Sequence, residues 1–153
     1  EHFHKLTQLG FYPKSWFWCY GVQWGDIAAL LPKKIRAMYG VILDKEITVV
    51  LDAAGFAYSD QWGVSASKEL ARSSRRWRKR GTTVVLLPQA FGPYKGAEIQ
   101  AYVKEWANNA TLVFPRELDS YVYLTDIIGE KEKINPKGFY LRTSFTRKLL
   151  GQG

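Results

Sequence analysis

The chain has 153 residues, enough for one packed domain, and 46% of them are hydrophobic, with six Trp, nine Tyr and eight Phe. This composition excludes a disordered chain, and apolar runs far shorter than about 20 residues exclude a transmembrane helix. The net charge of +8 would suit polyanions, phosphorylated small molecules or a peripheral association with an acidic membrane face.

The number of cysteines and the first residues of the chain suggest where the protein is located and whether it is processed. Cys19 is the single cysteine, so no internal disulfide framework forms and a reducing, cytoplasmic location is expected. The chain starts at Glu1 without a signal-peptide pattern, which predicts a fragment or a processed product. His2 and His4 are interpreted as part of a flexible terminus, because the chain has no other histidine. No metal site is predicted.

The first part of the chain is rich in aromatic residues. Residues 1–25 fit neither the helical nor the strand period and are predicted to be irregular. From Asp26 a helix is expected, because apolar residues recur at three- and four-residue steps and Asp26 suits the N-cap. Pro32 falls inside this pattern, so the helix either begins there or is kinked, and Gly40 ends it.

An alternation of strands and helices follows. Apolar, largely β-branched runs without polar alternation predict strands that are buried on both faces, as in a parallel sheet covered by helices. The predicted strands are 47–52, 83–88 and 111–115, and the predicted helices are 64–80, 97–108 and 118–128. This order predicts one α/β domain over residues 26–130, a Rossmann-like parallel sheet flanked by helices. Residues 131–153 are predicted to be an irregular C-terminal tail.

Polar and glycine residues follow each predicted strand. Parallel strands bring their carboxyl ends to one edge of the sheet, so we expect these residues to lie together. The groups in question are Asp52, Gly55, Tyr58, Ser59, Asp60, Gln89, Gly92, Arg116 and Ser120. Arg116 directly precedes a helix whose first turn has free N–H groups, an arrangement that suits phosphate or carboxylate. Alternatively, Arg116 pairs with Glu117 or Asp119 at the surface.

A second group of cations lies at the end of the helix predicted over 64–80. It consists of Arg72, Arg75, Arg76, Arg78, Lys79 and Arg80. We interpret it as a solvated helix end, where cations are favourable beside the macrodipole; the alternative is a polyanion-binding face. The chain has no recognised nucleic-acid motif, no Walker A sequence, no dinucleotide-binding glycine pattern and no nucleophile elbow.

Two segments one helix apart resemble the polysaccharide pyruvyl transferase family. Leu87-Pro-Gln-Ala-Phe-Gly-Pro-Tyr94 closes one predicted strand, and Val113-Phe-Pro-Arg-Glu-Leu-Asp-Ser120 closes the next. Members of the family typically carry Pro-Gln-x-x-Gly-Pro and then, one helix later, Arg-(Glu/Asp)-x-x-Ser. Val50–Tyr58 resembles the preceding strand and glycine loop, and Gly21–Asp26 resembles the Gly-Asp loop that opens the family's first helix. The resemblance covers residues 21–130.

The resemblance implies an enzyme of exopolysaccharide biosynthesis. Such an enzyme transfers the enolpyruvyl unit of phosphoenolpyruvate onto two hydroxyls of a sugar, in a polysaccharide or its lipid-linked precursor. The product is a pyruvate ketal, and phosphate is released. The implied fold is two Rossmann-like halves similar to GT-B glycosyltransferases, with phosphoenolpyruvate as donor substrate and no other cofactor. The implied substrate-binding residues are Arg116, Ser120, Gln89, Gly92, Gly55, Tyr58 and Asp26.

The family places further anion-binding and acid/base groups, including an Arg-Leu-His segment, in its C-terminal half. Here the nearest string, Leu141-Arg-Thr, lacks the histidine, and Ile134-Asn-Pro-Lys-Gly138 stands where the family has a Pro-Asp strand. We therefore expect the N-terminal half only, inactive alone, with the C-terminal half of the same enzyme as its partner and no nucleic acid. The alternatives are half of a GT-B-type glycosyltransferase and a non-catalytic basic module that binds polyanions.

Overall fold

A computed structural model describes residues 18–19, 22–23, 27–38, 42–129 and 133–135. The chain divides into two compact units, Glu1–Thr48 and Val49–Gly153, and each is described by itself. Asp26, His2, His4 and residues 136–153 lie outside the described residues. The predicted domain limits at residues 25 and 130 therefore stay predictions.

The first unit contains short elements. Strands β1 (Trp18–Cys19) and β2 (Val22–Gln23) pair antiparallel, in a stretch predicted to be irregular. Two 3₁₀ turns, η2 (Ile27–Leu30) and η3 (Asp44–Glu46), flank helix α2 (Lys33–Met38). Helix α2 begins directly after Pro32, so of the two alternatives for this proline the structure shows the helix start.

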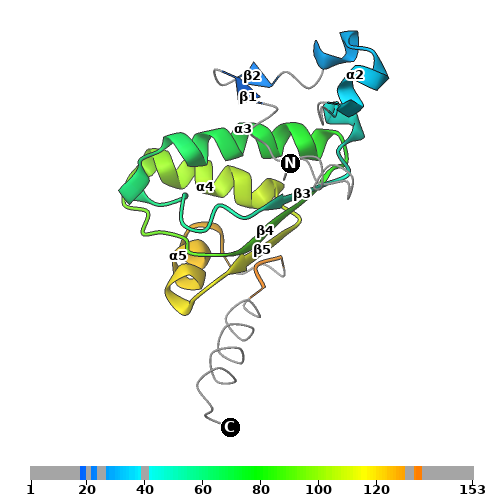
Figure 1. Ribbon diagram of the computed structural model, residues 1–153. Helices are drawn as coiled ribbons and strands as arrows, with labels where there is room; N and C mark the ends of the chain where they lie inside the picture. Colours follow the sequence, from blue (N-terminus) through cyan, green and yellow to red (C-terminus); the bar gives the residue numbers. More distant parts are fainter. Residues whose placement is uncertain (1–17, 20–21, 24–26, 39–41, 130–132, 136–153) are drawn as a thin grey trace, which may run out of the picture. The chain divides into compact units, whose positions relative to one another are not determined.

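The second unit is built on a parallel sheet. Its strands are β3 (Val49–Asp52), β4 (Thr83–Gln89) and β5 (Leu112–Pro115), in the order β3-β4-β5 (Figure 1). Val113 pairs with Leu86 of β4 and also makes an isolated parallel bridge with Ile134. The Rossmann-like α/β architecture predicted from the sequence is confirmed.

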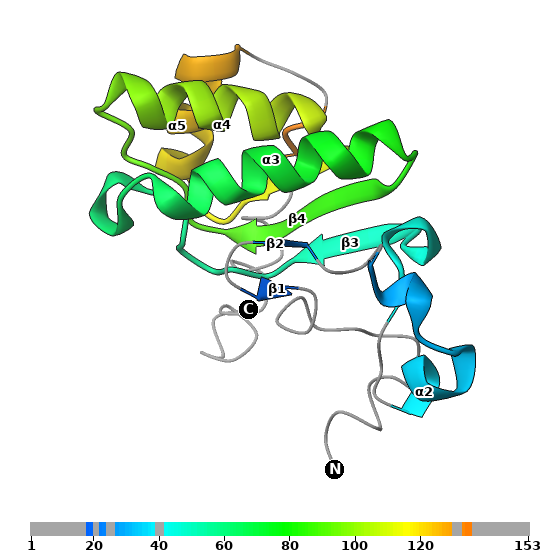
Figure 2. The ribbon, with the colours of Figure 1, turned by 90° about the horizontal axis from the view of Figure 1, so that it is seen from above.

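Three helices follow the three strands. They are α3 (Ser65–Lys79), α4 (Ala97–Asn109) and α5 (Leu118–Ile128), close to their predicted bounds. A short turn, η4 (Asp60–Trp62), precedes α3. Helices α3 and α4 lie side by side over one face of the sheet, and α4 also packs against α5 (Figure 2). The core under these helices includes Leu70, Trp77, Val84, Leu86, Ile99, Val103, Trp106, Val113 and Leu124.

The two faces of the sheet differ in burial, so the prediction that the strands are buried on both faces is wrong for the described residues. Val84 and Leu86 of β4 face the helices and are almost fully buried. On the other face, Val49 and Leu51 of β3 are each 51% exposed. The partly exposed residues of that face in the other two strands are Thr83, Val85, Leu87, Leu112 and Phe114. An apolar run alone does not reveal whether a second layer covers it.

Candidate functional site

The loops after β3 and β4 are joined by main-chain hydrogen bonds. The N–H of Ala90 donates to the carbonyl of Gly55 at 2.9 Å. The N–H of Gly92 donates to the carbonyl of Tyr58 at 3.4 Å. The glycine loop that follows β3 is therefore held directly against the loop that carries Gln89.

The loops after β4 and β5 are joined in the same way. The N–H of Arg116 donates to the carbonyl of Gln89 at 2.9 Å, and the N–H of Phe91 donates to Ser120 Oγ at 2.8 Å. The predicted gathering of the strand ends at one edge of the sheet is confirmed. We call the residues of these three loops the carboxyl edge: residues 53–64, 89–96 and 116–120.

Trp106 of α4 packs against residues of two of these loops from the core. Its side chain is fully buried, and its ring centroid lies 5.6 Å from that of Phe91 and 5.8 Å from that of Tyr58. Aromatic pairs at such separations stabilise by about 0.5–1.5 kcal/mol beyond their burial. One core residue thus fixes the loops after both β3 and β4.

The hydroxyl of Tyr58 forms a hydrogen bond within the domain. It donates to Asp52 Oδ2 at 2.5 Å, and Tyr58 itself is only 6% exposed. Burial, followed by the negative charge of Asp52, raises the pKa of Tyr58 far above its usual value, so the ring stays neutral. Gly55 has a φ of +75° and open space around it, so its backbone conformation explains the glycine.

Two features require glycine at position 92: its backbone conformation and its close contact with a neighbouring side chain. Its φ is +79°, and a Cβ built there would lie 2.5 Å from Cδ2 of the Tyr123 ring. Any side chain at this position would have to displace that ring. In this structure the glycine brings the loop after β4 close to α5.

Ser120 is also used to build the edge. It is 1% exposed, and its Oγ accepts the N–H of Phe91 while donating to Glu117 Oε1 at 3.1 Å. Both hydrogen-bonding roles of the hydroxyl are therefore engaged. These two contacts position the loop after β4 relative to α5, and the prediction that Ser120 binds substrate stays a prediction.

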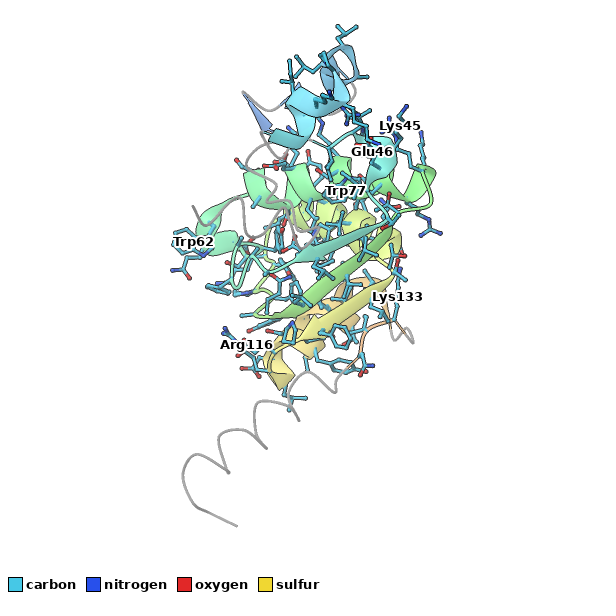
Figure 3. All side chains as sticks on the ribbon, turned by 45° about the vertical axis from the view of Figure 1, so that its right-hand side comes forward. Lys45, Glu46, Trp62, Trp77, Arg116 and Lys133 are labelled. Atoms are coloured by element: carbon cyan, nitrogen blue, oxygen red, sulfur yellow. The ribbon has the colours of Figure 1, made fainter. Side chains whose placement is uncertain are left out.

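Arg116 lies at the end of β5, as Figure 3 shows, and its side chain is 39% exposed. Its Nε contacts Glu117 Oε2 at 3.3 Å, which is one of the two surface pairings considered from the sequence. This contact uses Nε alone, and the two terminal nitrogens of a guanidinium carry four more N–H groups. Glu117 makes no side-chain capping bond to α5.

Gln89 is the unusual residue of the edge. It is fully buried, yet neither Oε1 nor Nε2 has a hydrogen-bond partner in the part of the chain that the structure describes. The pairing of β4 with β5 shifts in register between Leu86 and Gln89, so both residues lie on the buried side although they are three apart. Ser59, in the loop after β3, is likewise buried with its hydroxyl unpaired.

Trp62 belongs to this edge and was not among the predicted site residues. It lies in η4, in the loop after β3, and is 61% exposed. Figure 3 shows Trp62 and Arg116 toward one side of the unit and Lys133 toward the other. The signal in the sequence was a tryptophan inside a glycine-containing loop that follows a strand.

The basic end of α3 lies away from this edge. Helix α3 ends one short turn before β4 begins, so its last residues lie at the amino end of the strands. Arg75 forms an ion pair with Glu105 of α4, and Arg78 donates to the carbonyl of Asn108. At least two of the cations therefore tie α3 to α4.

No protein-family model, curated protein or solved structure matches this chain. Among the described residues, no three His, Cys, Asp or Glu side chains are grouped so that they could hold a metal ion. No described helix is long and apolar enough to cross a membrane. The resemblance to pyruvyl transferases therefore depends on the sequence segments alone.

Proposed function

We propose that this chain is the donor-binding part of a pyruvyltransferase of polysaccharide biosynthesis. It binds phosphoenolpyruvate at the carboxyl edge, between the loops that follow β4 and β5. Gln89 and Arg116 are the residues that recognise the ligand. Tyr58, Gly55, Gly92 and Ser120 hold the loops in place.

The unpaired carboxamide of Gln89 is the observation that carries this proposal. A buried polar group without a partner costs about 1–3 kcal/mol, and Gln89 has two such atoms next to the partly exposed Arg116, whereas Ser59 and Tyr94 of the same edge have one each. The carboxamide offers two N–H donors and one carbonyl acceptor. Because Gln89 is fully buried, a carboxylate or phosphate oxygen would accept from Nε2 only after a loop of the edge moves aside, and would then remove part of that cost.

Arg116 supplies the charge that a dense anion requires. Its terminal nitrogens can bind a carboxylate or phosphate in bidentate fashion. Helix α5 starts two residues later, and its first-turn N–H groups favour an anion at the same place. Two carboxylates oppose anion binding here: Glu117 contacts Arg116 Nε, and Asp119 lies in the first turn of α5.

The proposed reaction needs groups beyond these two. The methylene carbon of phosphoenolpyruvate gains a proton, a sugar hydroxyl attacks the adjacent carbon, and that hydroxyl loses its proton to a base. Departure of phosphate then lets a second hydroxyl close the ketal and lose its own proton. Gln89 and Arg116 hold the donor in this scheme. The acid and the base come from the C-terminal half that the resemblance implies.

Calorimetric titration with phosphoenolpyruvate tests the proposal. Arg116→Ala should weaken binding about tenfold or more, because hydrogen bonds to charged groups contribute about 1.5–3 kcal/mol. The matched control is Lys79→Ala, which removes one positive charge at the opposite edge of the sheet. If the control weakens binding as much as Arg116→Ala does, general charge attraction explains the affinity and the proposal fails. Absence of binding by the unmodified chain also contradicts it.

A further inference from the structure

A groove of about 470 Å³ lies between α4 and α5 and borders the loop after β4. Helix α4 lines it with Ala97 and Ala101, which are one turn apart and have only methyl side chains. These small residues leave room between the two helices. The volume lies within the range of about 300–1,000 Å³ that is usual for ligand sites.

Two tyrosine rings line the groove from different elements. Tyr123 comes from α5 and Tyr94 from the loop after β4. The ring of Tyr123 is also the one that packs against Gly92, three residues after Gln89. The groove and the proposed donor site therefore share the loop after β4, although neither Gln89 nor Arg116 lines the groove.

The polar residues of the groove do not select an anion. Lys104 and Asp126 line it with opposite charges, and both are exposed. Gln100 donates one N–H to the carbonyl of Tyr94 at 2.8 Å, and its carboxamide carries a second N–H and a carbonyl oxygen. Donors and acceptors are therefore both present without net charge. This set matches a neutral ligand with many hydroxyl groups.

We propose that this groove binds the sugar acceptor, as a neutral hexose unit of a polysaccharide. A sugar ring has an apolar face that packs on an aromatic ring and hydroxyls that both donate and accept. The tyrosine rings and the polar groups of the groove supply these two kinds of contact. This inference rests on the proposed function, because it assigns a place to the acceptor of that reaction.

The test is a nitrogen-15 NMR titration of the full chain with lactose, a neutral galactose-containing disaccharide. Ala101→Trp fills the groove from an exposed position, and Tyr123→Ala removes one ring. Each should weaken lactose binding by at least about tenfold, equivalent to about 1.4 kcal/mol. The control is Tyr102→Ala, a tyrosine of the same helix that contacts Lys68 and Glu98 instead and should leave the affinity unchanged.

Phosphoenolpyruvate is titrated into the same variants, so that the two proposals are separated. Lactose binding that is lost in Ala101→Trp, while phosphoenolpyruvate still binds, supports the groove as the acceptor site. Lactose binding that survives Ala101→Trp, or no lactose binding at all, overturns the inference and leaves the donor site standing. Lactose binding without any phosphoenolpyruvate binding supports the groove and refutes the proposed function.

Discussion

Replacing Gln89 with methionine should stabilise the domain and abolish phosphoenolpyruvate binding. Methionine has a similar length but no polar amide, so the change removes two buried atoms that lack partners. An unsatisfied buried group costs about 1–3 kcal/mol, and a shape-conserving substitution costs less than about 1.5 kcal/mol. Because the second value is subtracted from the first, we expect the free energy of unfolding to rise by up to about 3 kcal/mol.

Urea unfolding with linear extrapolation measures this change. The matched control is Gln100→Met, because the carboxamide of Gln100 donates to the carbonyl of Tyr94 at 2.8 Å. Removing that bond should lower the free energy of unfolding by about 0.5–1.5 kcal/mol. The two glutamines should thus respond with opposite signs to the same substitution.

A loss of stability in Gln89→Met of more than about 1 kcal/mol would refute the reasoning, since it would mean that the amide is satisfied in solution. A gain in stability together with lost ligand binding is the pattern expected of a residue kept for function at the expense of stability. A gain in stability with unchanged binding would remove Gln89 from the site.

Three further predictions concern neighbouring residues. Glu117→Gln removes the carboxylate beside Arg116, and calorimetry should show phosphoenolpyruvate binding that is several-fold stronger. The reason is that two unit charges 4 Å apart interact by about 1 kcal/mol in water. Weaker binding would contradict the anion site. Gly92→Ala should lower the free energy of unfolding by about 2–5 kcal/mol in urea unfolding, because it adds both backbone strain and overpacking. The control Gly81→Ala should cost only about 1–2 kcal/mol, because Gly81 has a φ of +76° but open space around it. Equal costs would show that the close contact at Gly92 is absent. Because the pKa of Tyr58 is raised in the folded state, the contribution of Tyr58 to stability is constant below pH 10.0 and decreases as the pH rises above 10.0. Tyr58→Phe should therefore reduce the loss of unfolding free energy at alkaline pH. An unchanged dependence on alkaline pH would argue against a buried hydroxyl.

The arrangement of the strands and helices could be predicted because the apolar period is strong. The residues from Leu118 to Ile128 repeat at helical steps, and the helix has those bounds. The exposure of the second sheet face could not be predicted. The apolar run that contains Val49 and Leu51 would have the same sequence whether or not a layer of helices covered that face. Burial on that face depends on tertiary packing that a local pattern does not contain.

The proximity of the residues that follow the strands was predicted better than the contacts that each of them makes. Chain order and parallel topology are sufficient to bring Gln89, Arg116 and Ser120 together. Which partner each polar group takes depends on distances of a few ångströms, and the sequence does not contain those. The sequence therefore did not reveal that the hydroxyl of Ser120 is hydrogen-bonded within the fold, or that the amide of Gln89 is buried and unpaired among the described residues.

The same contacts predict that this chain alone binds phosphoenolpyruvate without forming a ketal. Transfer needs an acid and a base, but three carboxylates of the described carboxyl edge and its flank already accept hydrogen bonds within the domain: Asp52 from Tyr58, Asp60 from the N–H of Lys95, and Glu117 from Ser120. The fourth carboxylate, Asp119, is exposed in the first turn of α5. Tyr58 cannot replace them, because its raised pKa keeps its proton in place at neutral pH. Incubation with phosphoenolpyruvate and lactose should therefore release no phosphate above the rate without protein. Phosphate release that depends on lactose would show that a carboxylate of the edge or its flank acts in the reaction. Asp52→Asn, Asp60→Asn, Glu117→Gln and Asp119→Asn would then identify which one.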